Sequence, residues 1–398
     1  MNDSNIISKS FQGWKIWLAI CIGLGVAAWM LIRGFKEVHF VKDEISGTHI
    51  WVDGNHDGKI DYKDPDEFQA VNSGGHFKIQ KTQDLLNEIT WTTETIFWML
   101  LALLFVVGRD FFYMLRIRLL TRKFLSWKRS FFVIMIWEFA SALSPGVISG
   151  SAVAMFILNR EKIPLGKSTA IVLITAFMDN LFYVLLIPLV FIFIDSEALF
   201  PSNLSSSGVS TVFWTGYFVF LGIVLFFFSA IFIFPSLANR FFKAVSSIPL
   251  LRRRRKGMLQ IGEDIELSAR VFRKEPLVFW IKVFLSTAGS WISRFLVINA
   301  LLQAFISLGV FQHILVLGKQ LVLWLLMRVS PTPGGSGIAE YAFGALLSDV
   351  GGSMLLITIL ALLWRLMSYF PYLFIGAFIL PRWIKQTDRK SKMVSKEL

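Results

Sequence analysis

Several ionisable side chains lie inside segments that are otherwise apolar, and these are the residues that could do chemistry. A charged group in hydrocarbon is costly, so each of them is expected to face a partner, the protein interior or a water-filled cavity. Such groups can bind an anionic ligand, pair with one another or carry protons. Lys282 lies near the end of its segment and can reach the interface, and the neighbours Arg109 and Asp110 could form a local ion pair. The residues are Arg109, Asp110, Glu138, Asp179, Lys282, Arg294, Lys319, Arg328, Glu340 and Arg365.

A run rich in proline and glycine at 330–337 interrupts the second half of the apolar sequence. Its prolines donate no backbone hydrogen bonds, and its glycines permit close backbone approach. A helix starting near Ile338 would point its free N–H groups and positive dipole end at this break, which predicts an anion site suited to phosphate. A plain turn within a broken helix is the alternative. The residues assigned to the site are Pro333, Gly334, Gly335 and Gly337, with Glu340 one turn further on.

The apolar segments repeat along the chain. Ser144 and Pro145 begin a similar break, and they precede the start of 330–337 by 330 − 144 = 186 residues. The same offset superimposes the apolar segment 95–118 on 281–304, the short apolar piece 127–142 on 313–328, and the span 168–194 on 354–380. This agreement indicates an internal duplication.

Asp179 and Arg365 occupy equivalent positions of the two halves. Equivalent positions of an inverted repeat lie near one pseudo-twofold axis, so we expect these two side chains to form an ion pair or to share a cavity. Such a pair could be a purely structural salt bridge or could take part in transport, and the sequence does not distinguish these alternatives. Arg328 is expected to add positive charge to the second break, and Arg109 or Arg294 to the cavity between the halves.

The composition is that of a helical membrane protein. Of 398 residues, 55% are hydrophobic and only 17% are charged, and the mean hydropathy is +0.61. Several apolar stretches exceed the roughly 18 residues that a membrane span needs, which excludes a soluble enzyme. The net charge of +13 is therefore explained by cytoplasmic loops rather than by nucleic acid. The single Cys21 excludes an internal disulfide framework.

The distribution of lysine and arginine predicts which loops are cytoplasmic. Both termini, the basic run at 116–129 and the basic segment 237–276 are expected inside. The segment 195–209, which has no Lys or Arg, is expected outside, and so is Asp349, the only charge beside the second hairpin. This order requires 130–158 and 313–347 to be re-entrant hairpins that enter the membrane from opposite faces; two Pro-kinked spans are the alternative. We predict an all-α, multi-pass protein of the cell (inner) membrane with an inverted repeat and about six full spans.

The divisions of the chain follow from this topology. The first span is expected at 14–32, and a cleaved signal peptide is the alternative for it. The basic segment contains a stretch expected to be amphipathic at 258–271. Anionic lipids of the inner leaflet are its natural partner, and the alternative is that the segment only sets the orientation of the chain. The divisions are a signal-anchor helix at 1–33, an external insert at 34–93, a first transmembrane repeat at 94–235, a basic cytoplasmic segment at 236–276, a second transmembrane repeat at 277–381 and a basic cytoplasmic tail at 382–398.

The external insert carries a calcium-loop motif of the EF-hand or dockerin type. The twelve residues from Asp53 to Asp64 have a glycine at the sixth position and Ile60 at the eighth. Asp64 replaces the usual bidentate glutamate, so we expect modest affinity and a structural role for Ca²⁺. The preceding 48–52 is expected to be extended, and a plain turn is the alternative. The predicted ligands are Asp53, Asn55, Asp57, Lys59, Asp61 and Asp64.

The segment Ser-Pro-Thr-Pro-Gly-Gly-Ser-Gly-Ile-Ala-Glu at 330–340, with Arg365 and Tyr369 in the following span, resembles the flippase-like family, the transmembrane region of lysylphosphatidylglycerol synthetases. The resemblance covers about 95–380 and implies translocation of lipids with a phosphate-bearing head group. The first break, 144–150, departs from the double-glycine form usual in that family. No aminoacyl-transferase domain follows, so we do not expect lipid synthesis.

We predict a transporter, not an enzyme, that moves a phospholipid or a polyprenyl-phosphate-type lipid between leaflets by alternating access. Glu138, Asp179 and Glu340 are candidates for proton coupling. The alternatives are a secondary carrier for a small anionic solute and an intramembrane lipid-modifying enzyme. The residues predicted to bind substrate are Arg109, Glu138, Ser144, Pro145, Asp179, Arg294, Arg328, Pro333, Gly334, Gly335, Gly337, Glu340, Arg365 and Tyr369.

Overall fold

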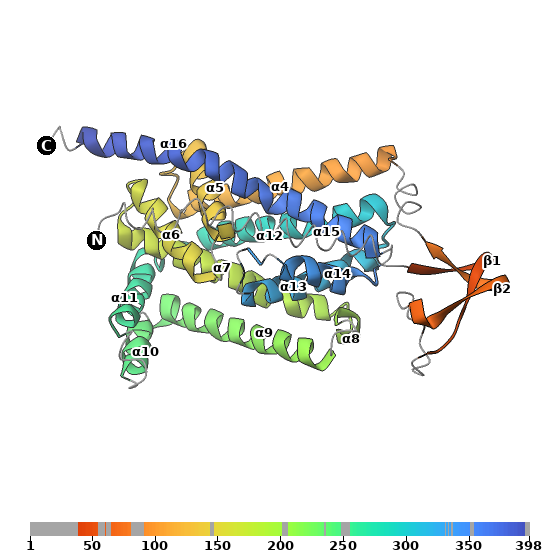
Figure 1. Cartoon of the computed structure of the whole chain (residues 1–398). Coiled ribbons are helices and arrows are strands. Elements are labelled where there is room, and N and C mark those ends of the chain that lie inside the picture. Colours follow the sequence, from red (N-terminus) through yellow and green to blue (C-terminus); the bar gives the residue numbers. More distant parts are fainter. Residues whose placement is uncertain are drawn as a thin grey trace.

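The computed structural model is a bundle of long helices with a small sheet at one end (Figure 1). The expected first span, 14–32, lies outside the described part of the chain, as do Ser144, Pro145 and Pro333. The structure describes residues 39–54, 60, 65–80, 91–143, 147–200, 206–234, 236–247, 255–330, 332, 334–335, 337–350 and 354–394.

Helices dominate the described residues, as the composition predicts. The strands are β1 (His39–Trp51) and β2 (Phe68–Gln80), with a 3₁₀ turn η1 (Pro65–Glu67) between them. The helices are α4 (Thr93–Leu120), α5 (Trp127–Leu143), α6 (Val147–Arg160), α7 (Leu165–Phe191), α8 (Ser196–Leu199), α9 (Ser206–Phe228), η2 (Ser229–Ile233), α10 (Leu237–Ser246), α11 (Arg255–Phe272), α12 (Leu277–Phe305), α13 (Val310–Val329), α14 (Ile338–Leu347), α15 (Met354–Ser368) and α16 (Phe370–Val394).

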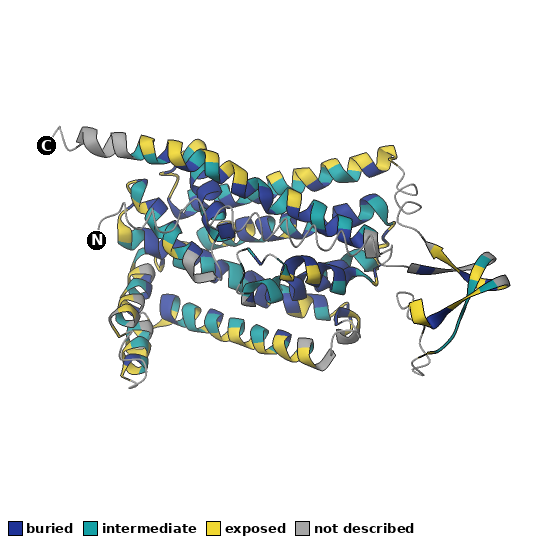
Figure 2. Ribbon diagram, viewed as in Figure 1, coloured by how far each residue is buried: buried dark blue, intermediate teal, exposed yellow. Residues whose placement is uncertain are grey.

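Six helical stretches among the described residues are long and apolar enough to cross a membrane. The prediction of a multi-pass helical membrane protein is therefore confirmed. Apolar side chains are also exposed on the outer faces of these helices, as lipid contact requires; Leu104 of α4 and Phe218 of α9 are examples (Figure 2). The six stretches are Thr93–Leu120, Leu165–Phe191, Ser210–Ile233, Leu277–Phe305, Val310–Arg328 and Leu356–Thr387.

Two of these helices differ from the expected pieces. The piece expected at 313–328 begins earlier, at Val310, because the Gln312 side chain accepts a hydrogen bond from the Gly309 N–H at 2.7 Å. The span expected at 354–380 is divided into α15 and α16 at Tyr369. Pro371 lacks a backbone N–H, and the next N–H, that of Tyr372, donates to the Tyr369 carbonyl at 3.2 Å, three residues back.

Helices α4 and α12 pack closely against each other. Gly108 of α4 faces Ser293 of α12, and Gly289 of α12 faces the ring of Phe112. Small residues at such crossings allow the backbones of membrane helices to approach each other. The hydroxyl of Ser290 accordingly donates to the Arg109 carbonyl at 3.1 Å. This crossing brings the arginines of α4 and α12 into one region.

In the insert, the described segments 39–51 and 68–80 pair as a two-stranded antiparallel sheet. Aromatic side chains form its core, with Phe40 stacked on Phe68 at 3.9 Å and Phe77 packed edge-on against Phe68. Aromatic pairs across strands are a common source of sheet stability. The expected extended backbone at 48–52 is found, since β1 runs to Trp51.

Helices α10 and α11 lie across the end of the bundle opposite the sheet (Figure 1). Glu266 of α11 joins them, because its carboxylate accepts hydrogen bonds from Asn239 of α10 at 3.0 Å and from Arg270 at 2.7 Å. The hydrogen bonds from Arg270 and Asn239 hold the pKa of Glu266 below its ordinary value. The amphipathic stretch expected at 258–271 is thus a helix packed on its neighbour.

Candidate functional site

Two adjacent cavities lie inside the helix bundle. The first, which we call the Asp179 cavity, has a volume of about 270 Å³ and is lined by α4, α5, α6, α7, α12 and α13. The second, the Arg365 cavity, has a volume of about 200 Å³ and reaches the break before α14 and the junction of α15 and α16. The residues that line both cavities are Glu138, Ser141, Arg294, Trp324 and Arg328.

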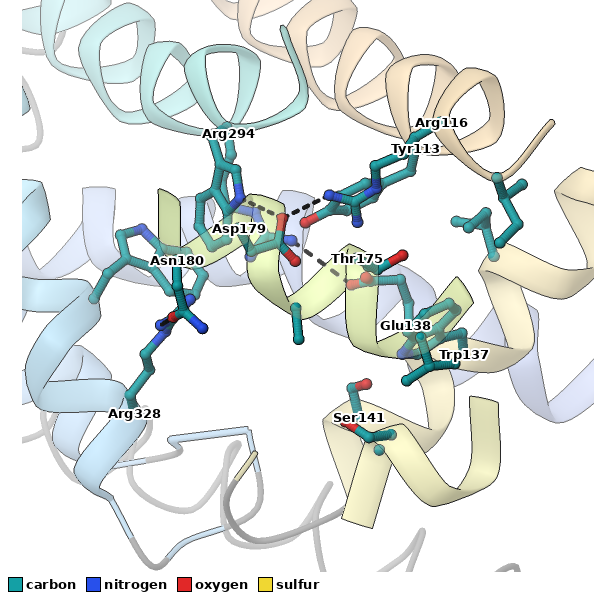
Figure 3. Close-up of a pocket in the computed structure, with 18 residues that line it drawn as sticks. Tyr113, Arg116, Trp137, Glu138, Ser141, Thr175, Asp179, Asn180, Arg294 and Arg328 are labelled. Carbon is teal, nitrogen blue, oxygen red and sulfur yellow. Dashed lines mark hydrogen bonds and ion pairs between the residues drawn. The ribbon is translucent and has the colours of Figure 1, made fainter. Parts of the chain in front are cut away.

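Asp179 is held on one wall of the first cavity by groups from α4 and α12 (Figure 3). Its carboxylate accepts hydrogen bonds from Arg116 at 2.6 Å and from the indole N–H of Trp291 at 2.9 Å. Arg116 also donates to the Thr287 hydroxyl at 3.2 Å. The expected Asp179–Arg365 ion pair is therefore wrong, since each residue has a nearer partner of opposite charge. The two residues line adjacent cavities instead.

Glu138 of α5 lies between the cavities and joins two arginines. It is ion-paired with Arg109 and lies 3.7 Å from Arg294. Arg109 is buried and also lies 3.5 Å from Asp110, the local pair expected from the sequence. Tyr372 of α16 donates to Asp110 at 2.9 Å. The network thus connects α4, α5, α12 and α16 through charged groups.

Arg365 holds the break that precedes α14. Its Nε donates to Glu340 at 2.7 Å, and its terminal nitrogens donate to the Gly334 carbonyl at 3.2 Å. The other carboxylate oxygen of Glu340 accepts the Gly337 N–H at 2.6 Å. The Gly337 N–H, one of the backbone donors of the expected anion site, is therefore already bonded to the Glu340 carboxylate. Gly334, Gly335 and Gly337 all have positive φ, at 58°, 69° and 87°, which glycine adopts without strain.

Tyr369 connects this break to the end of α5. Its ring packs against Gly334, and the Arg365 guanidinium lies 4.0 Å from the ring centroid. Its hydroxyl donates to the Ala142 carbonyl at 3.1 Å, close to the first break in the sequence. One tyrosine therefore contacts the second break and the helix that leads into the first.

Arg328 differs from the other cavity arginines in its partners. It donates to the Asn180 side chain at 2.9 Å and lies over the rings of Tyr183 and Phe220, at 4.7 and 5.0 Å from their centroids. No carboxylate of the described residues lies within 4.0 Å of it. Its charge is available to a ligand, whereas the other four arginines are ion-paired.

The predicted substrate residues are only partly gathered around the cavities. Gly337 and Glu340 do not line either cavity. They are connected to the Arg365 cavity through Arg365, because Glu340 accepts hydrogen bonds from both Arg365 and the Gly337 N–H. Ser144, Pro145 and Pro333 fall outside the described residues. The predicted residues that line a cavity are Arg109, Glu138, Asp179, Arg294, Arg328, Gly334, Gly335, Arg365 and Tyr369.

Sequence reasoning missed Arg116, which it assigned to a basic cytoplasmic run. Arg109, Tyr113 and Arg116 follow the spacing i, i+4, i+7 of one helix face, and this signal would have grouped them. The sequence also predicted no partner for Lys319. In the structure Lys319 is buried and ion-paired with Asp349, a residue that was expected to be a lone external charge. This pair lines neither cavity.

The predicted calcium loop stays a prediction. Asp53 is described, whereas the other five predicted ligands, Asn55, Asp57, Lys59, Asp61 and Asp64, lie outside the described residues. In the part of the chain that the structure describes, no three His, Cys, Asp or Glu side chains come together as a metal site.

Comparisons with known proteins cover the same region. The model of the family described as the lysylphosphatidylglycerol synthase TM region matches residues 82–376. A UPF0104 membrane protein of Archaeoglobus fulgidus is 25% identical over 324 residues, which cover 78% of this chain and 94% of that protein. No solved structure matches. Both cavities lie wholly within the matched residues.

Proposed function

The chain belongs to the family of the lysylphosphatidylglycerol synthase transmembrane region, and from this premise we propose that it moves a phosphate-bearing lipid between the leaflets of a membrane. The head group would occupy the Asp179 and Arg365 cavities while the acyl or polyprenyl chains stay in the bilayer. The lipid would be a phospholipid or a polyprenyl-phosphate-type lipid.

The observation that carries this proposal is the set of arginines around the two cavities. Arginine suits phosphate because its planar guanidinium donates two parallel hydrogen bonds to it. Arg328 supplies a charge without a carboxylate partner among the described residues, and Arg294 lines both cavities beside it. Such charges are retained in a membrane interior where they serve a ligand or a partner.

We further propose an inverted repeat in which α5–α6 and α13–α14 are opposed re-entrant hairpins. In support, α5 and α6 lie toward the end of the bundle with α11, while α13 and α14 lie toward the end with the sheet (Figure 1). Backbone that departs from a helix at membrane depth is tolerated where it lines a cavity, as Gly334 and Gly335 do. Tyr369 would couple the two hairpins during alternating access.

The sheet end would face the outside of the cell, and α10 and α11 would face the cytoplasm. The basic residues of 236–276 would then bind anionic lipids of the inner leaflet. The loop 53–64 would bind Ca²⁺ in the external insert and order that insert. Glu138, Asp179 and Glu340 would be the groups that couple transport to protons.

Lipid exchange in vesicles tests the proposed transport. The purified protein is reconstituted with fluorescent phosphatidylglycerol or polyprenyl phosphate, and the fraction accessible to an external quencher is followed over time. Arg328→Gln is expected to slow exchange at least about tenfold, the effect of losing one charge-assisted contact. Arg129→Gln is the matched control, because Arg129 pairs with Glu161 and lines neither cavity.

Two outcomes would contradict the proposal. Equal exchange in wild-type, Arg328→Gln and empty vesicles would show that the protein moves neither lipid. Uptake of glycerol 3-phosphate by wild-type vesicles that do not exchange lipid would favour a secondary carrier for small anionic solutes.

A further inference from the structure

The charges that the described residues place around the two cavities nearly cancel. Building on the proposed lipid transport, we propose that the site selects a head group with a single negative charge, a phosphodiester. We further propose that it recognises the uncharged oxygens of that head group through the indole N–H groups of Trp324 and Trp364.

Four carboxylates are ion-paired with the arginines that line the cavities. Asp179 pairs with Arg116, and Glu340 pairs with Arg365. Asp110 and Glu138 both contact Arg109, and Glu138 also lies near Arg294. Ionised, these groups leave one positive charge in excess. The lining arginines are Arg109, Arg116, Arg294, Arg328 and Arg365.

One positive charge in excess matches one negative charge on a ligand. A monoanion would make the occupied site neutral, whereas a phosphomonoester or a diphosphate would leave uncompensated negative charge in a low-dielectric interior. Uncompensated buried charge is costly. A phosphodiester carries one charge at neutral pH because it has a single ionisable oxygen. Arg328, with no carboxylate partner among the described residues, would make the principal contact.

Unpaired donors of the described residues line the same space. Trp364, which is 1% exposed, lines the Arg365 cavity, and its indole N–H has no acceptor. The indole N–H of Trp324, which lines both cavities, has none either, and neither has the hydroxyl of Thr175 in the Asp179 cavity. Leaving a buried donor unpaired costs free energy that an acceptor on a ligand recovers. Uncharged donors suit hydroxyl, ester or carbonyl oxygens.

Binding of soluble head-group analogues to the full-length protein in detergent tests the charge rule. The ligands are glycerophosphoglycerol, a diester; glycerol 3-phosphate, a monoester; and inorganic pyrophosphate. At pH 8 the monoester is a dianion, since its second pKa is about 6. We expect the diester to bind at least about tenfold more tightly than either of the others, as measured by calorimetry. Equal binding, or tighter binding of a dianion, would overturn the inference.

A change of one charge provides a second test. Glu138→Gln removes one negative charge from the cavity wall and is expected to shift the ratio of monoester to diester affinity about tenfold toward the monoester. Glu161→Gln is the matched control, because it also removes a buried, arginine-paired carboxylate but lines neither cavity. Its affinity ratio is expected to equal that of the wild type. An unchanged ratio in a folded Glu138→Gln protein would contradict the charge rule.

The neutral donors are tested with dimethyl phosphate, a diester without hydroxyls. Wild type is expected to bind glycerophosphoglycerol more tightly than dimethyl phosphate. Trp364→Phe is expected to lower the ratio of these two affinities about threefold or more. An unchanged preference would remove Trp364 from the proposed site. Diester binding without lipid exchange in vesicles would contradict the transport proposal alone, and exchange of a monoester lipid in preference to a diester lipid would contradict only the charge rule.

Discussion

Gly334 packs tightly against the ring of Tyr369 at the break before α14. The φ of Gly334 is 58°, and a Cβ at this position would overlap the ring of Tyr369. Moving the ring would break two contacts, because its hydroxyl donates to the Ala142 carbonyl and its face packs against the Arg365 guanidinium. The residue therefore meets both conditions that require glycine, a left-handed backbone and a close approach.

Gly334→Ala is expected to destabilise the protein. The positive φ alone costs alanine about 1–3 kcal/mol, and the overlap with Tyr369 adds to it. The measurement is thermal unfolding in detergent, with lipid exchange followed in parallel. Gly257→Ala on α11 is the control, because a Cβ there meets nothing within 4 Å. Equal melting temperatures for Gly334→Ala and wild type would contradict the described geometry.

The segments that flank the predicted calcium loop in the chain are joined to each other by hydrogen bonds. The Val52 N–H donates to the Glu67 carbonyl at 2.8 Å, and the Trp51 indole donates to the Glu67 side chain at 3.1 Å. These bonds bring the first residue of the loop close to the turn η1 that follows it. A cation bound to the loop would then lie next to two flanking segments that are already joined.

Removal of Ca²⁺ is expected to expose this loop to proteases. In the full-length protein, a chelator should increase cleavage within 53–64 several-fold, and added millimolar Ca²⁺ should reverse the effect. Asp57→Ala should be cleaved at the same rate with and without Ca²⁺, because it lacks a predicted ligand. Asp195→Ala, which removes an aspartate that lies outside the insert, should behave as wild type. Cleavage of the wild type that does not depend on Ca²⁺ would contradict calcium binding.

At the scale of the whole molecule, the two pairs α5–α6 and α13–α14 decide the topology. Lys128 and Lys162 flank the first pair, and Val310 and Ser348 flank the second. If each pair is a hairpin, both residues of a pair lie on one side of the membrane. If each pair is a single kinked span, they lie on opposite sides.

Cysteine labelling distinguishes these arrangements. After Cys21→Ser, which removes the single cysteine of the chain, one new cysteine is introduced at a time. We expect Lys128→Cys and Lys162→Cys to react with an impermeant reagent only from the cytoplasmic side. Val310→Cys and Ser348→Cys should react only from the outside. Labelling of the two members of a pair from opposite sides would contradict the hairpin.

Several elements were predictable because their cause is local. The long apolar helices follow from composition, and the break at 330–337 follows from its prolines and glycines. The sheet of the insert was only partly predictable, because strand pairing depends on contacts between 39–51 and 68–80 that no short segment reveals. The division of the last span at Tyr369 follows from Pro371, a signal present in the sequence but not used.

Composition and the length of the apolar segments establish a multi-pass helical membrane protein with charged residues inside those segments, because hydrocarbon imposes length and polarity on any span. Which of the charges meet depends on how the helices pack. Adjacent residues of a helix point about 100° apart, so small differences in helix rotation and crossing decide the partners. Asp179 therefore pairs with Arg116 rather than Arg365, and Arg328 keeps a charge that no carboxylate of the described residues neutralises.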